Sequence, residues 1–216
     1  MLILLSVTGV ACSNDDDEKK VNDPKTQTLT VDATKYNQWV YVNLKDGKTQ
    51  TVTMDGKDDE SKVTIDWQIA LHRYTEVKTN GGSVVQTAET SMDKVTEAPA
   101  GGYTADSDGQ RILVKFSMPP TDDCFVTTHC NTVMKWTEGS AMDGTLATTN
   151  KVFVLKCKDG SVAKLQFTDY ANSDNVNGHV TVQLIKDEKK GYLTSLRAVF
   201  AVHYSGGGTR FDDARR

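Results

Sequence analysis

The sequence has few of the features that place a chain across a membrane or on a nucleic acid. No apolar run approaches the roughly 20 residues that a membrane-spanning helix requires. Basic residues are in the minority: 25 Lys and Arg stand against 29 Asp and Glu, which leaves a net charge of -4. Because a phosphate backbone would meet no basic field, we expect neither a spanning helix nor a nucleic-acid partner.

Catalytic motifs are missing as well. The four histidines are His72, His129, His179 and His203. None of them stands in an H-E-x-x-H, C-x-x-C or G-x-S-x-G setting that would supply a metal-bound water or an activated nucleophile. His129 comes nearest to a zinc cluster, with Cys124 and Cys130 beside it, but a fourth ligand is not evident. We expect a binding protein and not an enzyme.

The sequence has only four cysteines, and the first of them, Cys12, lies close to the N-terminus. An apolar stretch from Leu2 to Val10 leads into Ala11-Cys12 and resembles the lipobox of lipoproteins, which would make Cys12 the acylated first residue after cleavage. The acidic, polar residues that follow resemble the surface-export signal of lipoproteins in gut and oral anaerobes. We therefore expect residues 1–12 to be a lipoprotein signal segment and 13–29 an acidic tether. The chain would be held at the outer membrane by lipid alone, on the cell surface or shed from it.

Acylation of Cys12 would leave three thiols in a compartment outside the reducing cytosol, so at most one disulfide can form within the domain. Cys124 and Cys130 enclose a small loop and are the pair that we expect to form it. Cys157 stands in an apolar strand pattern and is predicted to be a buried small hydrophobe.

From Lys25 onward, alternating patterns and β-branched residues favour strands over helices, so the sequence predicts a mostly β domain over residues 30–204. Val40, Val42 and Leu44 would share one face of a strand that turns at 45–48 into a second strand, 49–54. Residues 63–71 read as a buried strand with alternate residues on one face. Residues 178–184 form another alternating pattern.

The clearest hairpin signal is Lys158-Asp159-Gly160-Ser161 between the apolar runs 151–157 and 162–167. Asp-Gly in this position favours a type I′ turn, in which both central residues need positive φ. Residues 191–204 could add a further strand, although the spacing within 193–202 also fits a short helix. Residues 205–216 lack apolar content and are expected to be a disordered tail.

Three groups of segments follow one another along the chain: Asp66-Trp67-Gln68-Ile69-Ala70-Leu71-His72-Arg73-Tyr74 with Thr79-Asn80-Gly81-Gly82; Lys151-Val152-Phe153-Val154-Leu155 with Asp159-Gly160; and Ala163-Lys164-Leu165-Gln166-Phe167-Thr168-Asp169-Tyr170 with Gly178-His179-Val180-Thr181. Together they resemble the HmuY-like family of haem-binding lipoproteins. The resemblance spans about residues 30–184. It implies antiparallel sheets with few short helices. It also implies a haemophore that captures haem (iron protoporphyrin IX), possibly from host haemoproteins, and passes it to a TonB-dependent outer-membrane receptor.

In the prototype of this family two histidines hold the iron, whereas some relatives use methionines in the corresponding region. Here that region has His129 as its sole histidine, so the resemblance implies methionine ligation instead. Alignment through residues 151–153 and Trp136 places Met118 at the first ligand position and Met142 at the second. Alternatives are Met134, whose neighbours suggest ordinary core, and His129.

A porphyrin also needs an apolar slot with aromatic walls, for which Trp136, Phe116 and Phe125 are the candidates. A different function remains open at this stage: a surface lipoprotein of the same fold could recognise a glycan or a protein partner, with the methionines packed in its core.

Overall fold

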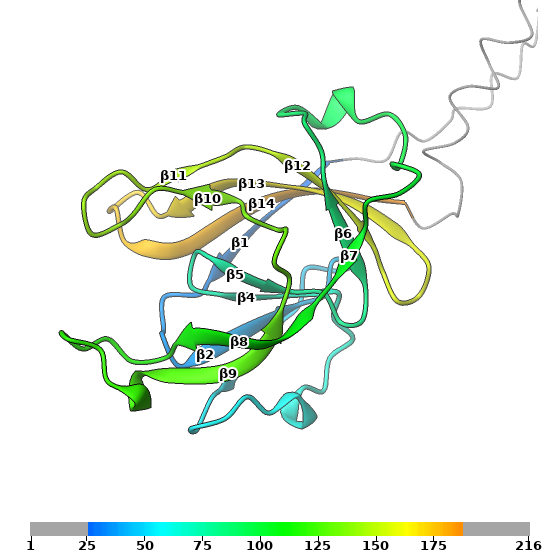
Figure 1. Ribbon diagram of the computed structural model, residues 1–216. Coiled ribbons are helices and arrows are strands. Elements are labelled where there is room, and N and C mark those ends of the chain that lie inside the picture. The colour runs from blue at the N-terminus through cyan, green and yellow to red at the C-terminus, as the bar shows by residue number, and fades with distance from the viewer. Residues whose placement is uncertain (1–25, 188–216) are drawn as a thin grey trace, which may run out of the picture.

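A computed structural model describes residues 26–187 and shows antiparallel β-sheets joined by loops and three short 3₁₀ turns (Figure 1). The largest sheet has six strands in the order β1 (Gln27–Asp32), β14 (Asn177–Asp187), β13 (Val162–Ala171), β12 (Val152–Lys156), β6 (Ser83–Gln86) and β7 (Thr104–Ala105). A four-stranded sheet has the order β3 (Thr49–Thr53), β2 (Gln38–Val42), β4 (Ile69–His72) and β5 (Glu76–Lys78).

Two hairpins complete the fold. One pairs β8 (Ser107–Leu113) with β9 (Phe125–Cys130), and the other pairs β10 (Thr137–Glu138) with β11 (Ala147–Thr148). The 3₁₀ turns are η1 (Glu60–Lys62), η2 (Met92–Lys94) and η3 (Asp122–Cys124). The predicted fold class, mostly β with antiparallel sheets, is confirmed. Within residues 26–187 no helix is long and apolar enough to cross a membrane.

Strands β2 and β4, at the centre of the four-stranded sheet, are buried on both faces. Val40, Val42 and Leu44 share one face, as predicted, and pack into the main core with β12, β13 and β14 of the six-stranded sheet. The other face carries Trp39 and Tyr41, which pack beneath the β8–β9 hairpin. Strand β2 is therefore apolar at nearly every position, because it lies in the middle layer of three.

The two predicted hairpins form in the expected places. Strands β2 and β3 pair across the turn at 45–48, and β12 pairs with β13 across residues 157–161. The turn type at the second hairpin was predicted wrongly. Gly160 has φ 81, but Asp159 is not among the residues with positive φ. The Cys157 carbonyl accepts from Gly160 N (2.9 Å), which fits a type I turn followed by a left-handed glycine rather than a type I′ turn.

The prediction of one strand over 63–71 was also wrong, because only Ile69–His72 pairs as β4. The preceding residues are held by a side chain instead of a neighbouring strand. Gln50 of β3 accepts hydrogen bonds through Oε1 from the backbone N–H groups of Thr64 (2.8 Å) and Ile65 (3.2 Å). A glutamine amide thus satisfies backbone donors that a strand ladder would otherwise pair.

The expected disulfide does not form: Cys124, Cys130 and Cys157 are all free and buried. Cys124 ends η3, and Cys130 is the last residue of β9. Six residues of extended strand span about 20 Å, whereas a disulfide requires Cα atoms within about 7 Å. Burial of Cys157 is as predicted. The segments 1–25 and 188–216, which include Cys12, the predicted element within 191–204 and the predicted tail, lie outside the described residues.

Candidate functional site

Met118 lies in the segment that joins β8 to η3 and is strongly exposed. The residue is 67% accessible, and Phe116, two residues before it, is 56% accessible. The Phe116 ring contacts Tyr36, with 6.3 Å between ring centroids. Met118 and Phe116 therefore present an apolar surface at one end of the β8–β9 hairpin.

Met142 lies in the loop between β10 and β11 and is 77% exposed. Its backbone is held in place although its side chain is free in solvent. Met142 N donates to Ser140 Oγ (3.1 Å), and Asp143 Oδ1 accepts from both the backbone N (3.0 Å) and the hydroxyl (2.6 Å) of Thr145. Hydrogen bonding to Thr145 lowers the pKa of the Asp143 carboxyl group, so these bonds persist at neutral pH. The loop thus presents the thioether from a fixed backbone.

Both methionine loops extend toward the same side of the molecule in Figure 1, at the left of the view. A band of stacked side chains connects them. The Arg73 guanidinium lies over the rings of Tyr36 (4.2 Å) and Tyr74 (5.0 Å). The Tyr74 ring then contacts Tyr170, 6.2 Å between centroids. Tyr170 Oη donates to the Leu146 carbonyl (2.8 Å) in the β10–β11 loop.

This band of Tyr36, Arg73, Tyr74 and Tyr170 brings positive charge and aromatic surface between the two loops. Arg73 has φ 53, a conformation that non-glycine residues rarely adopt, and its Nη1 donates to the Thr34 carbonyl. Its Nε is buried and has no hydrogen-bond partner among the described residues.

His72 anchors the band through its contact with the Tyr36 backbone. It is 1% exposed; Nε2 contacts the Tyr36 carbonyl (2.6 Å) and Nδ1 contacts the Glu76 carboxylate (2.9 Å). Arg73 and Tyr74, which follow His72, were not predicted from the sequence as site residues. The sequence feature that could have indicated them is an arginine and a tyrosine directly after an apolar strand.

The remaining candidates from the sequence lie elsewhere. Trp136 is 1% exposed and stacks on Phe167 in the main core, 4.7 Å between centroids. Met134 is equally buried there, in keeping with the core role that its neighbours suggested. Phe125 is half-buried on β9 beneath the Arg111 guanidinium (4.5 Å). His129 Nε2 faces Glu60 Oε1 at 3.1 Å.

Comparisons with known proteins give a consistent result. The sequence pattern of the HmuY protein family matches residues 35–183. Among solved structures, the apo HmuY analog of Tannerella forsythia is 33% identical with a TM-score of 0.69, covering 79% of this chain and 100% of its own. A Bacteroides vulgatus protein named as HmuY-like and heme binding is 31% identical with a TM-score of 0.65, covering 75% of this chain and 92% of its own.

Apo PinO from Porphyromonas gingivitis, 24% identical with a TM-score of 0.67, shares the fold and covers 78% of this chain and 100% of its own. A Bacteroides fragilis protein named as a lipoprotein is 29% identical with a TM-score of 0.66, covering 76% of this chain and 90% of its own. No curated protein matches the sequence. Since the family pattern extends over more than half of the 216 residues, the chain belongs to the HmuY family.

Proposed function

We propose that the chain captures haem outside the cell and holds its iron between the thioethers of Met118 and Met142. The main support for this proposal is the exposure of apolar side chains on the two loops. Among the described residues there are four exposed large hydrophobic side chains, and three of them, Phe116, Met118 and Met142, lie on the two loops. Both loops extend toward one side of the molecule (Figure 1), and exposed apolar side chains on one side of a domain favour a binding surface there.

The site fits the chemistry of haem. A porphyrin offers two apolar faces and two carboxylates, and a site for it needs apolar walls with a few polar groups. The two loops supply the apolar side chains. The band between them supplies tyrosine rings and the positive charge of the Arg73 guanidinium, which complements a carboxylate.

Thioether sulfur is a soft, neutral donor, which suits ferrous iron better than ferric iron. The two methionines therefore favour binding after reduction. They would leave no open position on the iron, so the role is carriage and not catalysis. The family, the Bacteroides vulgatus protein named as heme binding and the absence of a catalytic motif in the sequence support this reading.

The proposal extends to the setting of the protein. Acylated Cys12 would anchor the chain to the outer membrane, residues 13–29 would hold the domain, 30–204, away from the surface, and 205–216 would form a tail. Haem taken from host haemoproteins would then pass to a TonB-dependent receptor. The lipobox-like residues that end at Cys12 and the similarity to a Bacteroides fragilis protein named as a lipoprotein support this arrangement.

The test is a haemin titration followed by absorption, once in air and once with dithionite. We expect a low-spin spectrum that is strongest after reduction. Met118→Ala and Met142→Ala should each abolish that spectrum and weaken binding at least about tenfold, which corresponds to about 1.4 kcal/mol. Val176→Ala is the matched control, because Val176 is the fourth exposed large hydrophobic residue and lies outside both loops.

A low-spin spectrum that survives both methionine substitutions would move the iron ligands to His129 or Met134. An absence of saturable haem binding would reject the proposal and leave the glycan or protein partner as the function of this surface.

A further inference from the structure

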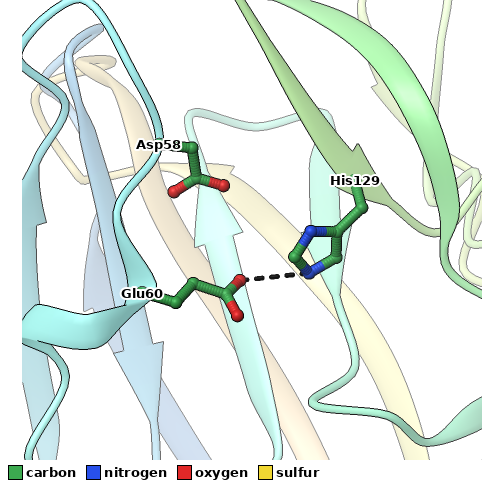
Figure 2. A group of neighbouring side chains, drawn as sticks. All are labelled: Asp58, Glu60 and His129. Carbon is green, nitrogen blue, oxygen red and sulfur yellow. Dashed lines mark ion pairs between the residues drawn. The ribbon is translucent and has the colours of Figure 1, made fainter.

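A second group of ligand-type side chains lies away from the methionine loops. Asp58 and Glu60 come from the segment around η1, and His129 comes from β9 (Figure 2). Figure 2 shows the two carboxylates and the imidazole turned toward a common space. One oxygen or nitrogen of each residue lies within 4.8 Å of the others, and Glu60 Oε1 is 3.1 Å from His129 Nε2.

These separations are close to those of ligands that share one metal ion. Zinc–nitrogen and zinc–oxygen bonds of about 2.0–2.2 Å place neighbouring ligand atoms about 3.0–3.6 Å apart. The Glu60–His129 separation already falls in this range. A triangle with sides of at most 4.8 Å closes around one ion after side-chain shifts of roughly 1 Å or less, which a partly exposed glutamate and histidine can make.

Lys78 is the cation already present beside the cluster. Its ammonium donates to Asp58 Oδ2 and to Glu60 Oε1 (2.8 Å), and it lies 4.5 Å from the centre of the Trp39 ring. Two carboxylates face one ammonium, so one negative charge is left without a lysine or arginine partner among these contacts. His129 can compensate it only when protonated.

The Asp58 carboxylate gives a second, independent reason to expect a bound cation. Its side chain is 8% exposed, and Oδ2 accepts from Lys78 and from Thr128 Oγ1 (2.5 Å). Its other oxygen, Oδ1, is buried with no donor among the described residues, and the hydroxyl of Tyr41 is likewise buried without a partner. Burial first, and the Asp58 charge second, raise the pKa of Tyr41, so that hydroxyl stays neutral. A buried carboxylate oxygen without a donor is costly unless a cation or a water meets it.

We propose that Asp58, Glu60 and His129 bind a divalent transition-metal ion of the zinc type, at a site distinct from the haem site. One nitrogen and two oxygens suit a borderline ion. Glu60 Oε1, which faces both His129 and Lys78, would leave the ammonium for the ion, while Lys78 keeps its bond to Asp58 Oδ2. The ion joins the η1 segment to β9. It thereby fastens the β8–β9 hairpin, whose connecting segment carries Met118, to the four-stranded sheet.

The test uses the full chain without haem, so its result is independent of the haem titration. Zn²⁺ is titrated calorimetrically, and thermal unfolding is measured with and without it. We expect one saturable equivalent and a rise in Tm of roughly 5 °C or more at a hundredfold excess over Kd. His129→Ala should weaken Zn²⁺ binding at least about tenfold, whereas the control His179→Ala, a half-buried histidine outside the cluster, should leave it unchanged.

Glu60→Gln removes the charge of one ligand with little change in shape. It replaces His129→Ala in this test if circular dichroism shows that His129→Ala does not fold. Co²⁺ then reports on the wild-type site through its visible absorption, which Glu60→Gln should diminish. Zn²⁺ binding of equal strength in wild type and both variants would assign the ion to other residues. No saturable Zn²⁺ heat would mean that water meets the bare Asp58 oxygen, and either result overturns the proposal.

Discussion

The thiol of Cys130 links the stability of the domain to alkaline pH. Burial, with smaller contributions from the charges of Glu76 and Asp106, raises the pKa of Cys130 to about 11 from a usual value of 9.0. Between these values the unfolded chain releases the thiol proton while the folded chain keeps it. The stability that this group contributes is therefore complete below pH 9 and is lost as the pH rises toward about 11.

We expect the free energy of unfolding, measured in urea, to fall between pH 9 and pH 11. The fall should be shallower in Cys130→Ala, which has no thiol to titrate at this position. Tyr41 and Cys157 contribute in the same direction and remain in both proteins, so the difference between the slopes isolates Cys130. Equal slopes would show that Cys130 does not titrate in this range.

Single residues also show which parts of the candidate site could be predicted from the sequence. Exposure of Met118 and Met142 follows from their Pro, Gly and Asp neighbours, which do not build a core. The position of Trp136 could not be read in this way, because its burial depends on Phe167, 31 residues later, whose ring it stacks on. Arg73 was missed for a similar reason. Its role depends on Tyr36, which another part of the chain brings beneath it.

At the scale of elements, the β10–β11 loop offers a matched pair of glycines around Met142. Gly139 has φ 78, and a Cβ there would lie 2.3 Å from the Thr145 carbonyl oxygen. Gly144 has φ 74 but has open space around it. Alanine at either position carries a similar backbone strain of about 1 kcal/mol, so the difference between the two variants reports the steric clash.

We expect Gly139→Ala to displace the Met142 loop and to weaken haem binding about tenfold, whereas Gly144→Ala should stay within about threefold of wild type. Haem titration of both variants measures this, and Tm shows whether the domain itself is intact. Similar affinities in both variants would mean that the loop adapts to the clash or that Met142 does not hold the iron.

Elements whose partners are nearby in the sequence were predicted well. The β2–β3 and β12–β13 hairpins need only a turn between two neighbouring strand patterns, and both are found where expected. Strand β4 was predicted to be too long. The alternation of Val63, Ile65 and Trp67 does not reveal that the Gln50 side chain accepts the backbone hydrogen bonds of this segment. Periodicity reports which side chains are buried, but not which group satisfies each backbone donor.

For the whole molecule, the proposed anchor gives a direct test of location. We expect the full chain, produced in a Gram-negative anaerobe, to sediment with membranes and to carry the added mass of acyl chains on a first residue that is Cys12. Cys12→Ala should appear in the soluble fraction with no acyl mass. A wild-type chain that is soluble and begins at Met1 would contradict the lipid anchor.

The pairing of β1 with β14 has a consequence for the order in which the chain is made and folded. Residue 27 pairs with residue 184, so the first strand of the largest sheet meets its partner only after about 150 further residues have been delivered. Contacts this distant in sequence slow folding, because a long loop must close before they form. A polypeptide threaded through a translocation pore from its N-terminus would therefore keep β1 unpaired until β14 has also passed.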